Sequence, residues 1–261
     1  MIRAAVVAGA SSGLGTQFAR YIDKNEQDID IIYLIARRKD RLEALARELK
    51  KRVCIAAFDA TNDEAASRFH NTLYADGAIV DIFINCIGYA KIGNYAAVST
   101  YETMHMIDTD VKAAVRMTLC VLPFMRENGR LMQICSTAAF QPLQHMNVYA
   151  ASKAFLYSYT RALRMELLPR GIIVTAVCPW WIRDTEFISV ATNNDNNKNV
   201  ASSVRNFYFT QDSKSVVRRA MRANRIGFAV STPGVMCTLH RIFCKLVPKQ
   251  MMMYIWEIMR R

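Results

Sequence analysis

Short apolar runs alternate with longer amphipathic segments along this chain, and no other feature limits its fold as strongly. The apolar runs predict seven strands, over residues 2–8, 30–35, 53–58, 79–84, 130–135, 172–178 and 225–230. The segments between them predict helices over residues 16–24, 39–51, 63–74, 101–125 and 149–168. Strands that alternate with helices need crossover connections. We therefore predict an α/β fold, a doubly wound and mostly seven-stranded parallel sheet with helices on both faces.

The 261 residues contain no linker, no repeated unit and no block of like charge long enough to form a tail. We therefore expect a single domain over residues 1–261 with a sizeable core. The net charge of +12 raises the question of nucleic acid. Basic residues are scattered, however, except at 37–41 and near the C-terminus, and no nucleic-acid-binding motif occurs. An anionic cofactor with an anionic or membrane-derived substrate explains the charge equally well, so no nucleic-acid partner is expected.

The seven cysteines are odd in number and include no Cys-x-x-Cys pair, which predicts core thiols in a reducing compartment. No secretory signal precedes the first strand, and no apolar run approaches transmembrane length. We expect a cytoplasmic protein.

The four histidines lack the spacing of metal ligands, so no metal site is expected. His145, four residues before Tyr149, is placed to edge a pocket around that tyrosine.

A glycine-rich turn, Gly9-Ala-Ser-Ser-Gly13-Leu-Gly15, joins the first strand to the first helix. Glycines let the backbone approach a ligand closely, and a helix start offers free N–H groups to a diphosphate. About 20 residues after such a turn, dinucleotide-binding folds usually have an acid for the adenosine ribose. This chain has Ala36 there, followed by Arg37 and Arg38. A guanidinium pairs with a 2′-phosphate that an acid would repel, which favours NADP(H) over NAD(H). The arginines also fit the start of a solvated helix.

Ser136, Tyr149 and Lys153 combine residue types suited to proton transfer. Tyr149 and Lys153 are four residues apart and so share one face of a helix, where an ammonium makes a phenol easier to ionise. Ser136 follows a strand, which places it at the carboxyl edge of the sheet, where open α/β folds bind ligands. A hydroxyl donor and a tunable phenol at one point suit a carbonyl oxygen whose carbon receives a hydride. Taken alone, the Tyr/Lys pair is also common on helix surfaces.

In order and spacing these motifs resemble the short-chain dehydrogenase/reductase family, classical type, over about residues 2–185. The resemblance rests on Gly9-x-x-x-Gly13-x-Gly15, Asp59, Asn85-x-x-Gly88, Ser136, Tyr149-x-x-x-Lys153 and Pro179. It implies a Rossmann fold in which Tyr149 is the general acid/base, Ser136 hydrogen-bonds the substrate oxygen, and Lys153 holds the nicotinamide ribose and lowers the Tyr149 pKa. It implies these cofactor-binding residues: Gly9, Ser11, Ser12, Gly13, Leu14, Gly15, Arg37, Arg38, Asp59, Ala60, Asn85, Gly88, Tyr149, Lys153, Pro179 and Thr185.

Departures from the family pattern concern the site. Asp110 stands where the family has a catalytic Asn, whose bound water feeds protons to the Lys. A carboxylate can hold the same water, but its charge favours protonated Lys153 and alters the proton relay. Trp180 and Trp181 follow Pro179, where the family usually has Gly. The two indoles are expected to shape a flat apolar substrate pocket, or one of them to pack in the core.

Two C-terminal segments are expected to concern the substrate. Residues 186–212 break the alternating pattern and include a stretch that indicates a mobile loop. The family resemblance implies that this region is a lid that closes over substrate, with Phe187 as a contact; the alternative is a surface insertion without function. The extension at 233–261 carries apolar residues at helical spacing, such as Leu239, Phe243 and Leu246, among basic ones. Such a segment can lie on an anionic membrane, pack in a subunit interface or roof the pocket. We favour packing or roofing, because an apolar stripe normally faces a core.

The sequence thus predicts an NADP(H)-dependent oxidoreductase that interconverts a secondary alcohol and a ketone by hydride transfer. The residues assigned to the substrate are His145, Trp180, Trp181 and Phe187. The tryptophans, the lid and the apolar extension favour a bulky hydrophobic substrate, such as a hydroxysteroid. Two alternatives stay open, namely reduction of a 3-oxoacyl thioester on a carrier protein and a non-catalytic NADP-binding scaffold. A homodimer or homotetramer is expected.

Overall fold

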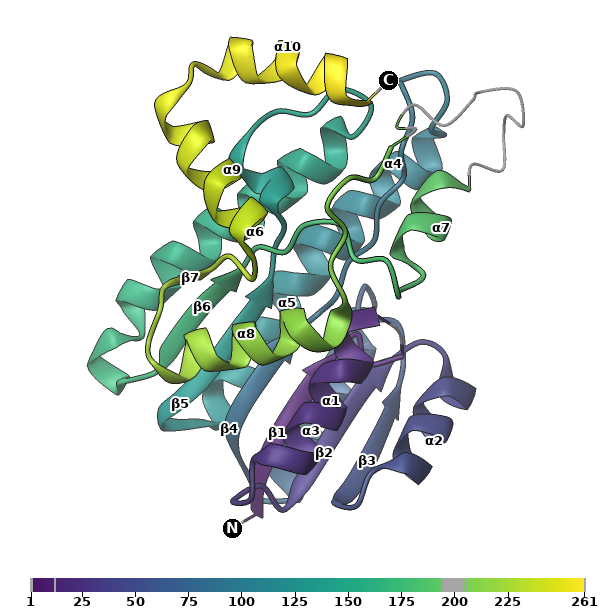
Figure 1. Ribbon diagram of the computed structural model, residues 1–261. Helices are drawn as coiled ribbons and strands as arrows, with labels where there is room; N and C mark the ends of the chain where they lie inside the picture. Colours follow the sequence, from purple (N-terminus) through teal and green to yellow (C-terminus); the bar gives the residue numbers. More distant parts are fainter. Residues whose placement is uncertain (1, 12, 194–203, 205, 261) are drawn as a thin grey trace.

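In a computed structural model of the chain, seven parallel strands form one sheet with helices on both faces (Figure 1). The structure describes residues 2–11, 13–193, 204 and 206–260. The strand order β3-β2-β1-β4-β5-β6-β7 confirms the predicted doubly wound fold. The strands are β1 Ile2–Ala8, β2 Ile31–Ala36, β3 Arg52–Ala57, β4 Ala78–Asn85, β5 Met125–Ile134, β6 Ile173–Val177 and β7 Val230–Ser231. The helices are α1 Gly13–Asn25, α2 Lys39–Glu48, α3 Asp63–Ala75, α4 Thr100–Ile107, α5 Ala114–Val121, α6 Asn147–Glu166, α7 Phe187–Thr192, α8 Ser213–Arg225, α9 Val235–Leu246 and α10 Lys249–Arg260.

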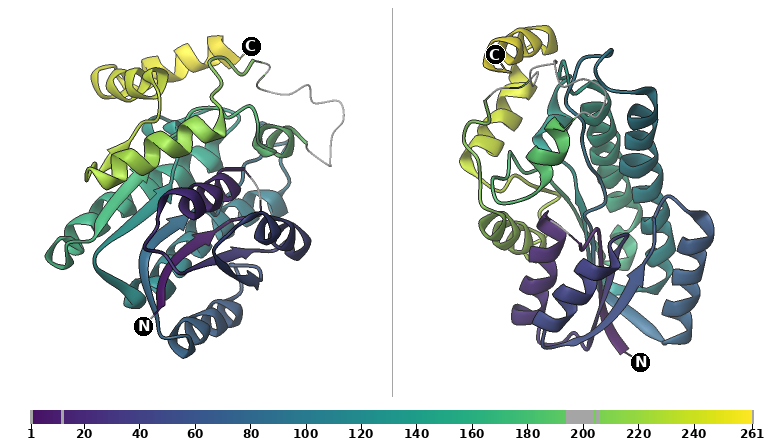
Figure 2. Two further views of the ribbon diagram at one scale, coloured as in Figure 1. Left: turned by 60° about the horizontal axis from the view of Figure 1, so that its bottom comes forward. Right: turned by 90° about the vertical axis from the view of Figure 1, so that its right-hand side faces the viewer.

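The central strands are apolar on both sides because both faces of the sheet are covered. Successive side chains of β1 point to opposite faces. Val6 packs in a core with Phe69 of α3 and with residues of α5 and α6. Val7 packs on the other face with Phe18 of α1 and with residues of α2 and α8. Figure 2 shows these two helical layers from other directions.

The direction in which strands are added to the sheet reverses between β1 and β4. From β1 the sheet continues through β2 to β3 on one side and through β4 to β7 on the other. Loops that leave the carboxyl ends of strands on either side of such a reversal diverge, and a crevice opens between them. The loops after β1, β2, β4, β5 and β6 all leave this edge of the sheet, where the predicted site residues are concentrated.

The long helix predicted over residues 101–125 is interrupted. Helix α4 passes into a π-helical turn at Asp108–Ala113, and α5 then ends in a 3₁₀ turn at Leu122–Phe124. Pro123 in that turn lacks the N–H that would continue the helix, so β5 begins at Met125, five residues before the predicted strand. Single π-helical turns are often found at functional sites.

The predicted seventh strand at 225–230 is wrong in position. Helix α8 continues through Arg225, and only Val230 and Ser231 pair with β6. Val217, Ala220 and Asn224 lie on its buried side at helical spacing, and packing on the sheet extends the helix.

In the span predicted as a lid, residues 187–192 form helix α7, whereas 194–203 and 205 lie outside the described residues.

The C-terminal extension folds into helices α9 and α10 above the carboxyl edge of the sheet (Figure 1). Met252 and Trp256 of α10 are buried, in line with the expected packing. Leu239, Phe243 and Leu246 of α9 are exposed, so the expectation that this stripe faces a core is not met. No helix in the described part of the chain is both long enough and apolar enough to cross a membrane.

Candidate active site

A cavity of about 370 Å³ follows the carboxyl edge of the sheet, from the turn after β1 to the loop after β6 and on to α10. Most of the site residues predicted from the sequence line it, although they come from different loops and helices. They are Gly9, Ser11, Gly13, Leu14, Gly15, Arg37, Arg38, Asp59, Ala60, Gly88, Ser136, Tyr149, Lys153, Pro179, Trp180, Trp181, Thr185 and Phe187.

Three of the predicted residues that the structure describes do not line the cavity. Asp110 lies behind the wall, next to Lys153, as described below. Asn85 is buried and donates an amide hydrogen to the Ala114 carbonyl at 2.9 Å, so it ties β4 to α5. His145 has a left-handed backbone, and its carbonyl accepts a hydrogen bond from the amide of Gly93 at 2.9 Å. The His145 side chain does not line the cavity, so its prediction as a substrate contact has no support from the structure. Ser12 lies outside the described residues.

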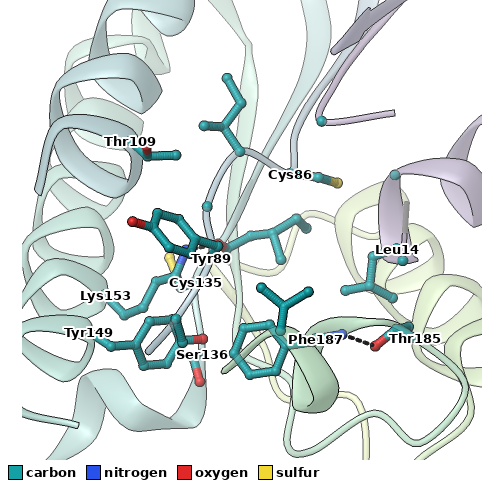
Figure 3. A pocket seen from close by; sticks show the side chains of 18 of the residues that line it. Leu14, Cys86, Tyr89, Thr109, Cys135, Ser136, Tyr149, Lys153, Thr185 and Phe187 are labelled. Atoms are coloured by element: carbon teal, nitrogen blue, oxygen red, sulfur yellow. Dashed lines mark hydrogen bonds between the residues drawn. The ribbon is translucent and has the colours of Figure 1, made fainter. Parts of the chain in front are cut away.

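Ser136, Tyr149 and Lys153 lie together in the cavity wall (Figure 3). Tyr149 and Lys153 share one face of α6, and the Lys153 Nζ atom lies 5.7 Å from the centroid of the phenol ring. Both side chains are almost fully buried. Ser136 caps the short helical turn after β5, because its hydroxyl accepts a hydrogen bond from the Ala138 amide at 3.1 Å. The same hydroxyl is near enough to the Tyr149 phenol to lower its pKa. The phenol, the hydroxyl and the ammonium therefore act on one small part of the cavity.

Lys153 is fixed from behind by Asp110. The ammonium lies 3.4 Å from Asp110 Oδ2 and donates to the Ile134 carbonyl at 3.4 Å. Asp110 belongs to the π-helical turn, is fully buried, and accepts a hydrogen bond from the Tyr89 amide at 2.9 Å. At Gly88 a Cβ atom would lie 2.6 Å from Lys153 Nζ, and the backbone φ is +145°. Only glycine leaves room for the ion pair there.

Burial and charge set the protonation of this group. Burial raises the pKa of Tyr149 above its ordinary value and Asp110 adds to the increase, while Lys153 and the Ser136 hydroxyl oppose it. Burial disfavours the charged form of Lys153, but Asp110, Tyr149 and Cys135 together outweigh this, Asp110 most of all, and raise the Lys153 pKa. Burial also raises the pKa of Asp110, against the attraction of Lys153. The expected lowering of the Tyr149 pKa by Lys153 is present but smaller than the effect of burial, so the phenol is protonated at neutral pH.

The other end of the cavity fits a dinucleotide. Gly9 has φ +79°, and a Cβ there would lie 2.7 Å from the Cys86 carbonyl oxygen. Gly13, Leu14 and Gly15 form the start of α1 and line the cavity, where the free N–H groups of a helix start can bind a diphosphate. Ala36 ends β2 in the cavity wall without an acid. The turn therefore has the room and the donors that the predicted cofactor needs.

The two arginines of this end have different surroundings. The Arg37 side chain is 61% exposed and lies 3.9 Å from Asp59. Arg38 is held by Glu186, just before α7, at 2.9 Å and donates to the Ser11 carbonyl at 3.2 Å. Arg41 also pairs with Glu186, and these two guanidinium groups lower the Glu186 pKa. Arg37 is thus the freer of the two to meet a 2′-phosphate.

Aromatic side chains form the wall beyond Tyr149. The Phe187 ring lies 5.6 Å from the Tyr149 ring, and Trp181 packs against Phe187 at 6.3 Å (Figure 3 shows Phe187 beside Tyr149). Trp180 also lines the cavity, with its ring 5.1 Å from that of His240 on α9. Both indoles therefore line the cavity, and their role in shaping a substrate pocket stays a prediction. Burial lowers the His240 pKa to about 4, so this imidazole is neutral.

Sequence reasoning assigned no site role to several residues that line this cavity, among them one each from α9, α10 and the segment before α7. Trp256 of α10 reaches it while its indole N–H donates to the Gln144 carbonyl at 3.0 Å. His240 and Glu186 also line it. The spacing of Met252 and Trp256 gave a weak signal for a buried face of α10, and Glu186 directly follows the predicted cofactor residue Thr185. Nothing in the sequence indicated which surface α10 would cover.

Comparison with known proteins agrees with this geometry. The sequence profile of the family described as short chain dehydrogenase matches residues 3–196. The chain is 35% identical over 198 residues to the NADP-dependent 3-hydroxy acid dehydrogenase of Salmonella typhi, covering 74% of this chain and 78% of that protein. A short-chain dehydrogenase from Sphingobium yanoikuyae in complex with NADPH superimposes with a TM-score of 0.75 at 23% identity, over 95% of this chain and 97% of that one. The closed form of serine dehydrogenase complexed with NADP⁺ gives a TM-score of 0.75 at 27% identity, over 88% and 93% of the two chains.

Proposed function

The chain belongs to the short-chain dehydrogenase/reductase family, and on that premise we propose that it reduces a bulky hydrophobic ketone, such as an oxosteroid, to the secondary alcohol. As a member of this family it is an NADP(H)-dependent oxidoreductase that acts on CH–OH groups. One observation carries the finer proposal. The Tyr149 phenol is buried where the dinucleotide end of the cavity meets its aromatic end, beside the Ser136 hydroxyl.

The side chains have separable roles in this reaction. NADPH, when bound, supplies the hydride. Ser136 donates a hydrogen bond to the substrate carbonyl oxygen, and Tyr149 donates the proton that this oxygen needs as charge develops on it. Lys153, kept as an ammonium by Asp110, stabilises the phenolate that is left. The Gly9–Gly15 turn would hold the diphosphate and Arg37 the 2′-phosphate. Burial raises the Tyr149 pKa, so the phenol carries the proton that reduction of a ketone needs.

The lining of the aromatic end supports a substrate without a carboxylate. Trp181, Phe187 and Trp256 form this part of the wall. Among the described lining residues, the arginines belong to the dinucleotide end and Lys153 is paired with Asp110. The Salmonella relative is named for 3-hydroxy acids. A carboxylate of that kind is normally bound by a cation, and the described aromatic wall contributes a neutral imidazole instead.

The two alternative functions receive less support. A carrier-bound 3-oxoacyl thioester would use the same Ser136, Tyr149 and Lys153, so the catalytic residues do not separate it from a ketone. The aromatic wall, however, favours a rigid bulky ring system over a slender acyl chain. A scaffold would not need a buried phenol held between a hydroxyl and an ammonium, and such arrangements with shifted pKa values are concentrated at functional sites.

Members of the family oligomerise, and we extend the proposal to a homodimer or homotetramer. Apolar side chains on α4, α5 and α6 are exposed in the single chain, among them Tyr101, Leu119 and Phe155. Large exposed apolar groups on neighbouring helices indicate a covered surface. We also expect the enzyme to act in the cytoplasm, in keeping with its seven free cysteines.

The proposal is tested by following NADPH oxidation with a panel of oxosteroids, aliphatic ketones and 3-oxoacyl thioesters. A parallel assay follows NADP⁺ reduction with 3-hydroxy acids. We expect the highest kcat/KM with an oxosteroid or another bulky ketone. Higher kcat/KM with thioesters or hydroxy acids would refute the proposed substrate class. NADPH binding without turnover of any compound in the panel would favour the scaffold.

A further inference from the structure

Helices α9 and α10 each carry an apolar stripe that faces away from the protein. On α9 the stripe consists of residues spaced by three or four positions, which are 48–77% exposed: Val235, Leu239, Ile242, Phe243 and Leu246. On α10 it consists of Met251, Tyr254, Ile255 and Ile258, which are 36–76% exposed. The opposite side of α10 is the buried one, with Met252 and Trp256. A helix in a soluble domain normally turns its apolar stripe to the core.

Positive charge is concentrated in the same part of the chain. Residues 213–261 contain ten Lys and Arg but one acid, Glu257, so they carry +9 of the net charge of +12. Within the described structure Glu257 pairs with Arg260, whereas Arg241, Lys245 and Lys249 form no ion pair. Lys245 and Lys249 are exposed beside the two stripes. Helix α8 adds five exposed basic residues and lies on the same side of the molecule as α9 in Figures 1 and 2.

We propose that the exposed stripes of α9 and α10 dock this enzyme on an anionic lipid bilayer. Amphipathic helices bind such surfaces by burying apolar side chains at the lipid boundary while basic side chains meet the anionic headgroups. A second copy of the chain fits less well, because an isologous contact would bring Lys245 and Lys249 of both chains together. Nucleic acid would satisfy the charge but would leave the aliphatic stripes in water.

In the docked orientation, helices α9 and α10 lie between the cavity and the bilayer. Trp256 lines the cavity from the inner side of α10, and His240 lines it from α9. The outer sides of the same helices carry the stripes. A hydrophobic compound dissolved in the bilayer therefore lies next to the elements that form the aromatic end of the cavity. The docking itself does not depend on which substrate the enzyme reduces.

The test is flotation of the full chain with vesicles of phosphatidylcholine alone or mixed with phosphatidylglycerol. We expect flotation with the anionic vesicles at low salt, and less of it with neutral vesicles or at high salt, which screens charge. Lys245→Gln/Lys249→Gln should weaken partitioning roughly thirtyfold, at about fivefold for each basic residue near an anionic surface. Leu239→Ser/Phe243→Ser should weaken it at every salt concentration, because it removes buried apolar area.

Matched variants control for general effects. Lys24→Gln/Lys50→Gln removes two exposed basic residues near the opposite edge of the sheet and should leave flotation unchanged. Tyr74→Ser/Tyr95→Ser removes two exposed apolar side chains that lie outside the stripes and should also leave flotation unchanged. The proposal would be overturned if the wild type did not float, or if the two C-terminal double variants and their controls lost flotation equally. Loss of self-association in Leu239→Ser/Phe243→Ser by sedimentation velocity, or binding to a DNA duplex without binding to vesicles, would also overturn it.

Discussion

A carboxylate at position 110 gives this site an unusual charge balance. Asp110 is fully buried, lies 3.4 Å from the Lys153 ammonium, and keeps its orientation through the Tyr89 amide. Its charge raises the pKa of Lys153 and contributes to the raised pKa of Tyr149. The residue therefore affects proton transfer without touching the substrate.

Asp110→Asn should keep the enzyme active but shift its pH profile. Without the carboxylate the Tyr149 pKa falls. Since Tyr149 must be protonated to reduce a ketone, the alkaline limb of kcat/KM should move to lower pH. Asp108→Asn is the matched control, because Asp108 lies in the same turn but pairs at the surface with Lys112. An unshifted limb, or loss of activity with NADPH binding intact, would show that Asp110 acts in another way.

Arg37→Ala should reduce cofactor affinity selectively. Its exposed guanidinium lines the cavity next to Asp59, whereas Arg38 is engaged by Glu186. We expect the Kd for NADPH to rise about tenfold or more, the effect of a lost charged hydrogen bond, while the Kd for NADH stays the same. Arg47→Ala, an exposed arginine farther along α2, serves as the control in a fluorescence titration. Equal loss of affinity for both cofactors would contradict a 2′-phosphate contact.

At the scale of elements, one carboxylate joins three of them. Glu26, which follows α1, binds Arg130 of β5 at 2.6 Å and Arg225 at the end of α8 at 2.8 Å. Glu26 and Arg130 are mostly buried, so Glu26→Ala leaves Arg130 without its partner.

Glu26→Ala should lower the free energy of unfolding by about 2–3 kcal/mol, near the lower end of the range for broken buried pairs. Glu48→Ala is the control, because its pair with Arg20 is largely exposed and should contribute less than about 1 kcal/mol. Urea denaturation followed by circular dichroism measures both. Equal losses in the two variants would mean that the three-element contact adds no stability.

A strand or helix could be located from the sequence where its own residues show a clear apolar pattern. Strands β1 to β6 are apolar runs and were located within a few residues, apart from the early start of β5. Strand β7 is only Val230–Ser231, and its existence depends on pairing with β6, which leaves no pattern in its own sequence. The π-helical turn at Asp108–Ala113 likewise arises from packing, because one extra residue in a turn does not alter composition.

At the scale of the whole molecule, the exposed apolar side chains of α5 and α6 should hold two copies together. Leu119→Asp/Phe155→Asp places charges on that surface, and we expect it to shift the sedimentation coefficient toward that of a monomer. Tyr74→Asp alters a more exposed side chain on α3 and should leave the assembly unchanged. A variant that sediments like the wild type would place the subunit contact elsewhere.

The parts of the site that the sequence predicted are those carried by short motifs. Gly9, Ser136, Tyr149 and Lys153 reach one cavity because the ends of parallel strands share one edge. The contribution of Trp256 could not be foreseen, since it depends on how α10 folds back over Gln144, more than a hundred residues earlier in the chain. Residues brought in by tertiary packing leave no local signal.

The central claim, that Tyr149 donates the proton, is tested most directly by comparing Tyr149→Phe with the wild type. The measurement is ketone-dependent NADPH oxidation together with NADPH affinity. We predict that turnover falls by about 10²–10⁴-fold, the usual contribution of a general acid, while NADPH still binds. Turnover near the wild-type rate in this variant would contradict the account, because the reaction would then proceed without the Tyr149 hydroxyl.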